Sequence, residues 1–213
     1  MQAALQSTTM QKPTRKNDPE RLRGHVLDVA ARLFQTRGYH ATSMHDLMKE
    51  TGVSGGALHH HFPTKKSLGL SVIAERVAPT VAEAWIDPVR VAPSLARGIA
   101  KVFAEIIAGV EARGSVAGCP LNNLTLELAL SDPDFRAAIQ AIFAAWRSAL
   151  VERISKTPGG SKLDHAKRTA AADFLISSYS GAMNLAKAMQ DSSPLRSCAK
   201  VLSEWLRERA LTT

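Results

Sequence analysis

The chain has 213 residues, 45% of them hydrophobic, so it is long enough for a small domain and a larger domain with its own core. Its formal charge of +8 and pI near 9.8 exclude a strongly acidic protein and favour a polyanionic partner such as nucleic acid. There is no run of about eighteen apolar residues, no apolar signal segment in residues 1–17, and only two widely separated cysteines. We therefore expect a cytoplasmic protein with no membrane span.

Positive charge is concentrated at the N-terminal end of the chain. Residues 1–66 hold ten Lys and Arg against five Asp and Glu, whereas residues 67–213 hold seventeen against fourteen. Residues 1–17 are predicted to form a flexible basic tail that adds weak, nonspecific affinity for DNA. A basic surface that serves only solubility would give the same charge, so charge alone does not establish DNA binding.

Three helices are predicted in succession after this tail. An Asp-Pro pair ending at Pro19 is typical of a helix start, and an apolar face with helical spacing follows it. Thr42 or Ser43 then caps a second, short helix, with Asp46 placed to complete a capping box. Gly52 marks a tight turn before a third short helix. This layout predicts a helix-turn-helix DNA-binding unit.

The exposed face of the third helix carries small residues and histidines. Small residues at a helix N-terminus let the backbone approach a DNA phosphate closely, and the helix dipole favours that anion. Lys65 and Lys66 follow directly, where a phosphate contact would fix the position of the unit on DNA. The residues predicted to face the major groove are Ser54, Gly55, Gly56, His59 and His60.

The segment from Gly38 to Leu68 resembles the DNA-binding domain of TetR-family transcriptional regulators. Two departures from the family pattern are Gly55, where lysine is common, and His59, where tyrosine is usual. The resemblance implies that Thr42, Ser43 and Lys65 hold phosphates while the third helix reads bases. The matching positions are Gly38, Tyr39, Thr42, Ser43, Asp46, Leu47, Gly52, Val53, Ser54, Gly56, Leu58, His61, Phe62, Lys65 and Leu68.

The rest of the chain is also predicted to be helical, because strand-like alternation is absent and turn signals come at helical intervals. With the first three helices this gives about nine, the number usual in the family. The resemblance implies an all-α fold with a DNA-binding domain at 18–66 and a ligand-binding and dimerisation domain at 67–213. The later helices are predicted at residues 67–86, 93–112, 120–130, 132–156, 163–190 and 193–210.

In the family, the last two long helices pair with those of a second subunit. Small residues from Ala170 to Ala182 would permit close helix approach, and residues from Leu195 to Leu206 give the last helix an apolar stripe. Such a stripe also suits packing within one subunit. A homodimer would place two DNA-binding units on a two-fold axis, which suits a palindromic operator.

A cavity for a small-molecule effector is predicted among the middle helices. Large apolar residues there give a lining with a few polar groups, although side chains at this spacing also fill ordinary cores. The segment from Gly118 to Leu124 resembles a Gly-Cys-Pro-Leu-x-Asn element that lies at the mouth of the effector cavity in one branch of the family. The predicted contacts are Trp85, Phe103, Cys119, Asn122, Glu127, Phe143, Trp146, Phe174 and Met183, with Leu121, Leu124, Tyr179 and Asn123 nearby.

Other chemistry has weaker support in the sequence. Cys119 lies near a predicted helix start, where the dipole would stabilise a reactive thiolate, but a free cysteine is also a common small buried hydrophobe. His59, His60 and His61 point about 100° apart on a helix and cannot converge on one metal ion. No enzyme motif, metal-site spacing or phosphate-binding glycine loop occurs, so we expect neither catalysis nor a cofactor.

These observations lead to one main hypothesis and two alternatives. The main hypothesis is a TetR-like repressor, released from a palindromic operator by a small, largely apolar ligand. The first alternative is a basic architectural protein that binds DNA without regard to sequence. The second is a thiol-based sensor of electrophiles or oxidants acting through Cys119, or a small helical enzyme using Cys119 or histidine-rich chemistry.

Overall fold

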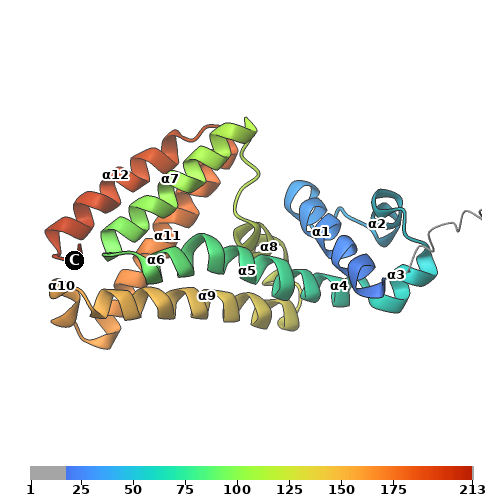
Figure 1. The fold of residues 1–213 in the computed structure, drawn as a ribbon, viewed down its shortest axis with the longest axis horizontal. Coiled ribbons are helices and arrows are strands. Elements are labelled where there is room, and N and C mark those ends of the chain that lie inside the picture. Colours follow the sequence, from blue (N-terminus) through green and yellow to red (C-terminus); the bar gives the residue numbers. More distant parts are fainter. Residues whose placement is uncertain (1–17, 213) are drawn as a thin grey trace, which may run out of the picture.

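The computed structural model describes residues 18–212, which are helical and contain no strand (Figure 1). The predicted tail at residues 1–17 lies outside this range. The all-α fold is therefore confirmed. The helical segments are α1 (Pro19–Arg37), α2 (Met44–Thr51), α3 (Gly55–His61), α4 (Lys65–Val72), η1 (Ile73–Val77), α5 (Ala78–Val81), η2 (Ala82–Ile86), α6 (Asp87–Val91), α7 (Leu95–Arg113), α8 (Pro120–Leu128), α9 (Pro133–Ser155), α10 (Pro158–Ser161), α11 (His165–Met189) and α12 (Ser193–Glu208).

The first three helices form a small bundle at one end of the molecule (Figure 1). Asp18 caps α1 by accepting hydrogen bonds from the backbone N–H groups of Glu20 and Arg21. Gly52 ends α2 in the left-handed conformation, with φ of 68°, which glycine adopts without strain. The bundle core consists of Val26, Ala30, Leu33, Phe34, Leu47, Leu58 and Phe62, each at most 1% exposed.

The segments from α4 to α6 make one continuous helical rod from Lys65 to Val91 that connects the bundle to the rest of the molecule. We predicted that this helix would end before Asp87, and that prediction is wrong. Pro79 and Pro88 each follow a short π-helical segment, in which the hydrogen bonds span five residues. A wider turn relieves the clash between a proline ring and the preceding carbonyls, so the rod continues through both prolines.

The larger domain packs against this rod. In Figure 1, α9 runs alongside the rod, and α7 lies with α11 and α12 at the far end. The short helix α8 packs against α1, the rod and α9. Counting the rod as one helix, residues 18–212 contain ten helices, one more than expected. The additional helix is α10, a single turn that Thr157 caps by accepting a hydrogen bond from the backbone N–H of Gly160.

Candidate DNA-binding face and effector pocket

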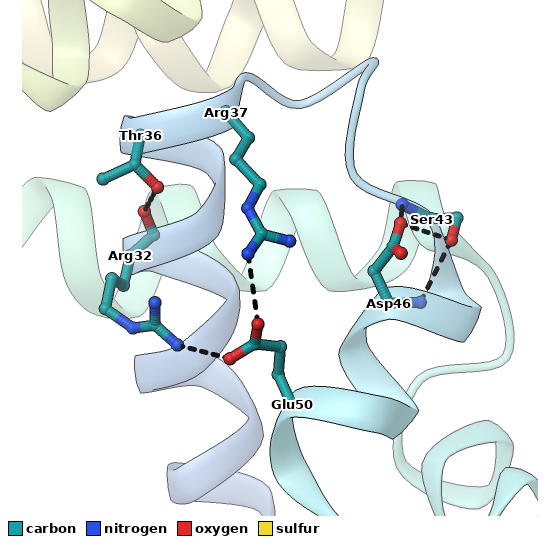
Figure 2. Close-up of polar contacts among 6 residues, drawn as sticks. All are labelled: Arg32, Thr36, Arg37, Ser43, Asp46 and Glu50. Carbon is teal, nitrogen blue, oxygen red and sulfur yellow. Dashed lines mark hydrogen bonds and ion pairs between the residues drawn. The ribbon is translucent and has the colours of Figure 1, made fainter.

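Polar contacts between α1 and α2 fix the geometry of the DNA-binding unit (Figure 2). The Ser43 hydroxyl accepts a hydrogen bond from Asp46 N at 3.0 Å, and the Asp46 carboxylate accepts one from Ser43 N at 2.8 Å. The Glu50 carboxylate on α2 forms ion pairs with two guanidinium groups of α1, with N–O distances of 3.0 Å to Arg32 and 3.1 Å to Arg37. The capping box predicted from sequence is therefore present, and it sets where α2 begins.

Removal of the Ser43 cap provides the first test of this geometry. Ser43→Ala is expected to lower the free energy of unfolding by about 1 kcal/mol, because Asp46 N loses its acceptor. Thr36→Ala is the matched control: the Thr36 hydroxyl donates to the carbonyl of Arg32 within α1 and caps nothing, so little change is expected. Urea unfolding measures both, and equal losses would contradict the capping role.

The same cap has a pH dependence. Hydrogen bonds from Ser43, chiefly from its side chain, hold the pKa of Asp46 below its usual range. A lowered pKa in the folded state means that this contribution is present above the unfolded pKa of about 3.9 and is lost as the pH falls through the folded value. Ser43→Ala is thus expected to matter less in acid than at neutral pH.

The third helix presents its predicted face to solvent. Ser54 is the N-cap of α3 and accepts a hydrogen bond from Ala57 N at 3.3 Å. A Cβ built on Gly56 meets nothing within 4 Å, whereas one on Gly55 lies 3.3 Å from the Met48 sulfur of α2. Ser54, Gly56, His59 and His60 are all exposed, and Gly55 is half-buried. The arrangement leaves a helix N-terminus and two imidazoles accessible to a large partner.

Two of the predicted phosphate contacts are not placed as expected. The Thr42 side chain is 0% exposed and its hydroxyl donates to the carbonyl of Gly38 at 2.8 Å, so its predicted phosphate contact is wrong. Lys65 is half-buried: its ammonium donates to the carbonyl of His40 at 3.2 Å and lies 4.4 Å from the Tyr39 ring centroid. Burial lowers the pKa of this ammonium. Ser43 remains exposed at the start of α2.

The side chains of the histidine run at residues 59–61 do not converge on a metal site in the described structure. His59 approaches the carbonyl of Pro63 at 3.4 Å, and the His61 ring packs beside Phe62 with centroids 6.3 Å apart. Across residues 18–212, no group of three His, Cys, Asp or Glu side chains is arranged to hold a metal ion. The helices of the same range include none long and apolar enough to cross a membrane.

A pocket of about 640 Å³ lies where the DNA-binding bundle meets the larger domain. Its size falls within the roughly 300–1,000 Å³ typical of small-molecule sites. One wall comes from α1 and the others come from the rod, α7, the α7–α8 loop, α8 and α11. The lining residues are Ala31, Phe34, Gln35, Thr36, Val72, Arg76, Val77, Thr80, Ala84, Val102, Glu105, Ile106, Gly109, Arg113, Ser115, Ala117, Gly118, Cys119, Pro120, Leu124, Tyr179 and Met183.

Most of the predicted effector contacts lie elsewhere. Cys119 and Met183 line the pocket, but Trp85, Phe103 and Trp146 are buried core residues behind it. Their rings pack together and against Tyr179, with centroids 4.6 Å apart for Trp85 and Tyr179 and 4.9 Å for Trp85 and Trp146. The alternative interpretation of these aromatic residues, as ordinary core, is therefore the one that describes their packing.

Four other predicted contacts also lie away from the pocket lining. Asn122 is buried and its side-chain oxygen accepts a hydrogen bond from Ser180 at 3.3 Å. The Glu127 carboxylate accepts a hydrogen bond from His40 N at 3.1 Å, which ties α8 to the DNA-binding bundle. Phe174 is 42% exposed on the outside of α11, and Phe143 is half-buried and stacks on Trp146.

The sequence interpretation missed the charged members of the pocket. Arg76 and Arg113 line it, but charged side chains on amphipathic helices ordinarily mark a solvated face, so they carry no separate signal. Gln35 also lines it and donates to the carbonyl of Gly118 at 3.0 Å, joining α1 to the α7–α8 loop. A wall from α1 could not be predicted, because it depends on how two sequence-distant domains meet.

Cys119 and Tyr179 are two buried residues of the pocket lining. Burial raises the pKa of the Cys119 thiol, and burial likewise raises that of the Tyr179 phenol. Cys119 is 6% exposed, so the neutral thiol is favoured and the thiolate needed for fast reaction with electrophiles is disfavoured. The structure thus places Cys119 as a small buried group at the pocket surface.

The three-helix unit with its exposed α3, joined to a larger helical domain, is the architecture of a DNA-binding transcriptional regulator. The family models agree with this class. Residues 26–72 match the model described as "Bacterial regulatory proteins, tetR family", and residues 96–201 match "Transcriptional regulator LmrA/YxaF-like, C-terminal domain". The chain belongs to the TetR family of transcriptional regulators.

Known relatives and structures resemble the chain along most of its length. It is 25% identical to the HTH-type transcriptional regulator LmrA of Bacillus subtilis, covering 87% of this chain and 96% of that protein. It is 26% identical to the HTH-type transcriptional repressor DhaR of Mycobacterium sp. strain GP1, covering 87% and 92%. A TetR regulator from Chloroflexus aurantiacus has the same fold, with a TM-score of 0.79, 23% identity and coverage of 92% and 98%.

Proposed function

We propose that this TetR-family regulator is a repressor that a small, largely apolar ligand releases from a palindromic operator. The observation that carries the proposal is the pocket, because α1 of the DNA-binding unit supplies one of its walls. A ligand in that position touches both domains and can favour one relative placement of them over another. The reading face of α3 and the domain limits at 18–66 and 67–213 are part of this proposal.

Two ion pairs connect the DNA-binding unit to the rod and can transmit a shift of one to the other. Arg23 on α1 makes two hydrogen bonds of 2.6 Å to Glu75 on the rod, and Arg76 pairs with Asp28 on α1 at 2.6 Å. Both pairs join α1 to η1, the first π-helical segment of the rod. A ligand that shifts the rod against α1 therefore also shifts α2, which packs on α1, and with it α3, which packs on α2.

The operator would be palindromic because the regulator would bind as a homodimer through α11 and α12. Phe174, Leu185 and Met189 are 42%, 58% and 59% exposed on α11, at spacings of eleven and four residues that place them on one helix face. Between them lies Gly181, where a Cβ meets nothing within 4 Å. Val201 on α12 is 59% exposed, and Trp205 packs on Phe174 with ring centroids 4.8 Å apart.

We infer that a second copy of the chain covers this apolar face. A continuous exposed apolar stripe on two adjacent helices suits a two-fold four-helix interface, with the small residue at its centre letting the helices approach. Two DNA-binding units on one two-fold axis then address two successive major grooves.

Two alternatives have less support. A purely architectural DNA-binding protein leaves the pocket between the domains unexplained. A thiol-based sensor needs an ionised Cys119, and burial disfavours that form.

Binding of the purified protein to DNA from the region upstream of its own gene, against scrambled DNA across a salt series, tests the proposal. A preference of about a thousandfold or more, at one dimer per palindrome, is expected of a specific regulator. Equal affinities that fall together with salt would mean phosphate attraction alone and would favour the architectural alternative.

A further inference from the structure

The pocket at the domain junction carries more positive than negative charge. Its charged lining residues are Arg76, Arg113 and Glu105. Glu105 already has a cation beside it outside the lining, because Lys101 lies 3.7 Å away along α7. The two guanidinium groups are therefore the cationic groups that an anionic ligand would meet in the pocket.

Arg113 has no hydrogen-bond or ion-pair partner within residues 18–212. It lies over Gly109, one turn earlier on α7, where a built Cβ would come 3.3 Å from its Nη1 atom. The missing side chain at Gly109 gives the guanidinium room against the pocket wall. Arg113 is exposed at the pocket lining, and an arginine there without a carboxylate partner is suited to bind an anion.

Arg76 is occupied, but by a contact that a ligand can replace. Its Nε lies 2.6 Å from Asp28 Oδ1, and its Nη2 donates to the carbonyl of Gly24 at 3.1 Å, both on α1. The side chains of Arg76 and Asp28 are 29% and 66% exposed, and an ion pair open to water contributes little to stability. Asp28 can return to water when it loses its partner.

We propose that the effector is an amphipathic carboxylate whose anionic group binds Arg113 and takes Arg76 from Asp28. This inference rests on the proposed function and adds the chemical class of the ligand and the contact that it breaks. The apolar body of the ligand packs on side chains such as Val77, Val102, Ile106 and Met183. The bound carboxylate replaces one of the two ion pairs that join the rod to α1, the helix that supplies a pocket wall from the DNA-binding unit.

Matched acids and amides test the ligand class. Naphthalene-2-carboxylate, 4-phenylbutyrate and decanoate are each titrated into the dimer by calorimetry, beside the amide of the same skeleton. At least one acid is expected to bind about tenfold or more tightly than its amide, because a charge-assisted hydrogen bond exceeds a neutral one. The proposal is overturned if no acid binds, or if every amide binds as tightly as its acid.

Three variants test whether the ligand carboxylate replaces Asp28 as the partner of Arg76. Arg76→Gln and Arg113→Gln are expected to reduce acid binding to the level of the amide, while leaving the amide unaffected. Asp28→Asn is expected to raise acid affinity several-fold, since Arg76 no longer has a competing carboxylate. Arg97→Gln, an exposed position on the same helix as Arg113, is the matched control and leaves acid binding unchanged. Unchanged or weaker acid binding by Asp28→Asn would overturn the proposal that the ligand competes with Asp28 for Arg76.

Operator release separates this inference from the proposed function. The acid that binds is expected to release operator DNA from the wild-type protein but not from Arg76→Gln. A protein without specific operator binding contradicts the proposed function, whereas the calorimetric comparison uses no DNA and still decides the ligand class.

Discussion

Leu185→Asp is expected to convert the proposed dimer into monomers and to lower operator affinity by a hundredfold or more. Leu185 is 58% exposed on the α11 stripe, one turn from Gly181, and a two-fold interface would bury two aspartates close to one another. Burial of like charges without partners disfavours association strongly. Monomers then lose the gain in effective concentration that comes from binding two half-sites at once. Light scattering and operator titration measure the two effects.

The matched control is Val91→Asp. Val91 is 78% exposed at the end of the rod, outside the proposed interface, so this variant is expected to stay dimeric with wild-type operator affinity. A Leu185→Asp protein that remains dimeric would move the subunit interface away from α11 and α12.

His60→Ala is expected to reduce the preference for operator over scrambled DNA by about a hundredfold, without changing the salt dependence of binding. His60 is exposed on the outer face of α3, and a lost base contact of about 1–3 kcal/mol counts twice in a dimer. A contact to a base edge neutralises no phosphate and releases no counterion from DNA, so the slope of affinity against salt is expected to stay constant. Electrophoretic mobility shifts across a salt series provide the measurement.

His165→Ala serves as the control for the His60 variant, because His165 is exposed at the start of α11 in the larger domain. It is expected to leave both specificity and salt dependence unchanged. If His60→Ala weakens operator and scrambled DNA equally, the imidazole contacts phosphate and the operator is read by other groups.

The local features of the DNA-binding unit follow closely from the sequence. Asp18 with Pro19, and Ser43 with Asp46, encode helix starts through hydrogen bonds that span only two or three residues. The turn at Gly52 needs a left-handed backbone that glycine provides. These interactions form between near neighbours, so spacing alone predicts them.

Features that depend on neighbours distant in sequence were predicted less well. Thr42 was expected on the surface, but it is buried and its hydroxyl donates to the carbonyl of Gly38. Glu127 was expected in the effector cavity, but its carboxylate accepts a hydrogen bond from His40 N. The large aromatic residues were expected to line that cavity, yet Trp85 and Trp146 fill the core. Helical spacing shows which residues share a face, but not what that face contacts.

The all-helical fold and the helix-turn-helix unit can be predicted from local patterns, because helix caps, turns and apolar periodicity act over a few residues. The continuation of the rod through Pro79 and Pro88, and the pocket wall that α1 forms, depend instead on the tertiary structure. It also brought Arg76 to Asp28, 48 positions apart in the chain. Such contacts arise when whole helices pack, and packing selects among arrangements that are equally compatible with each helix alone.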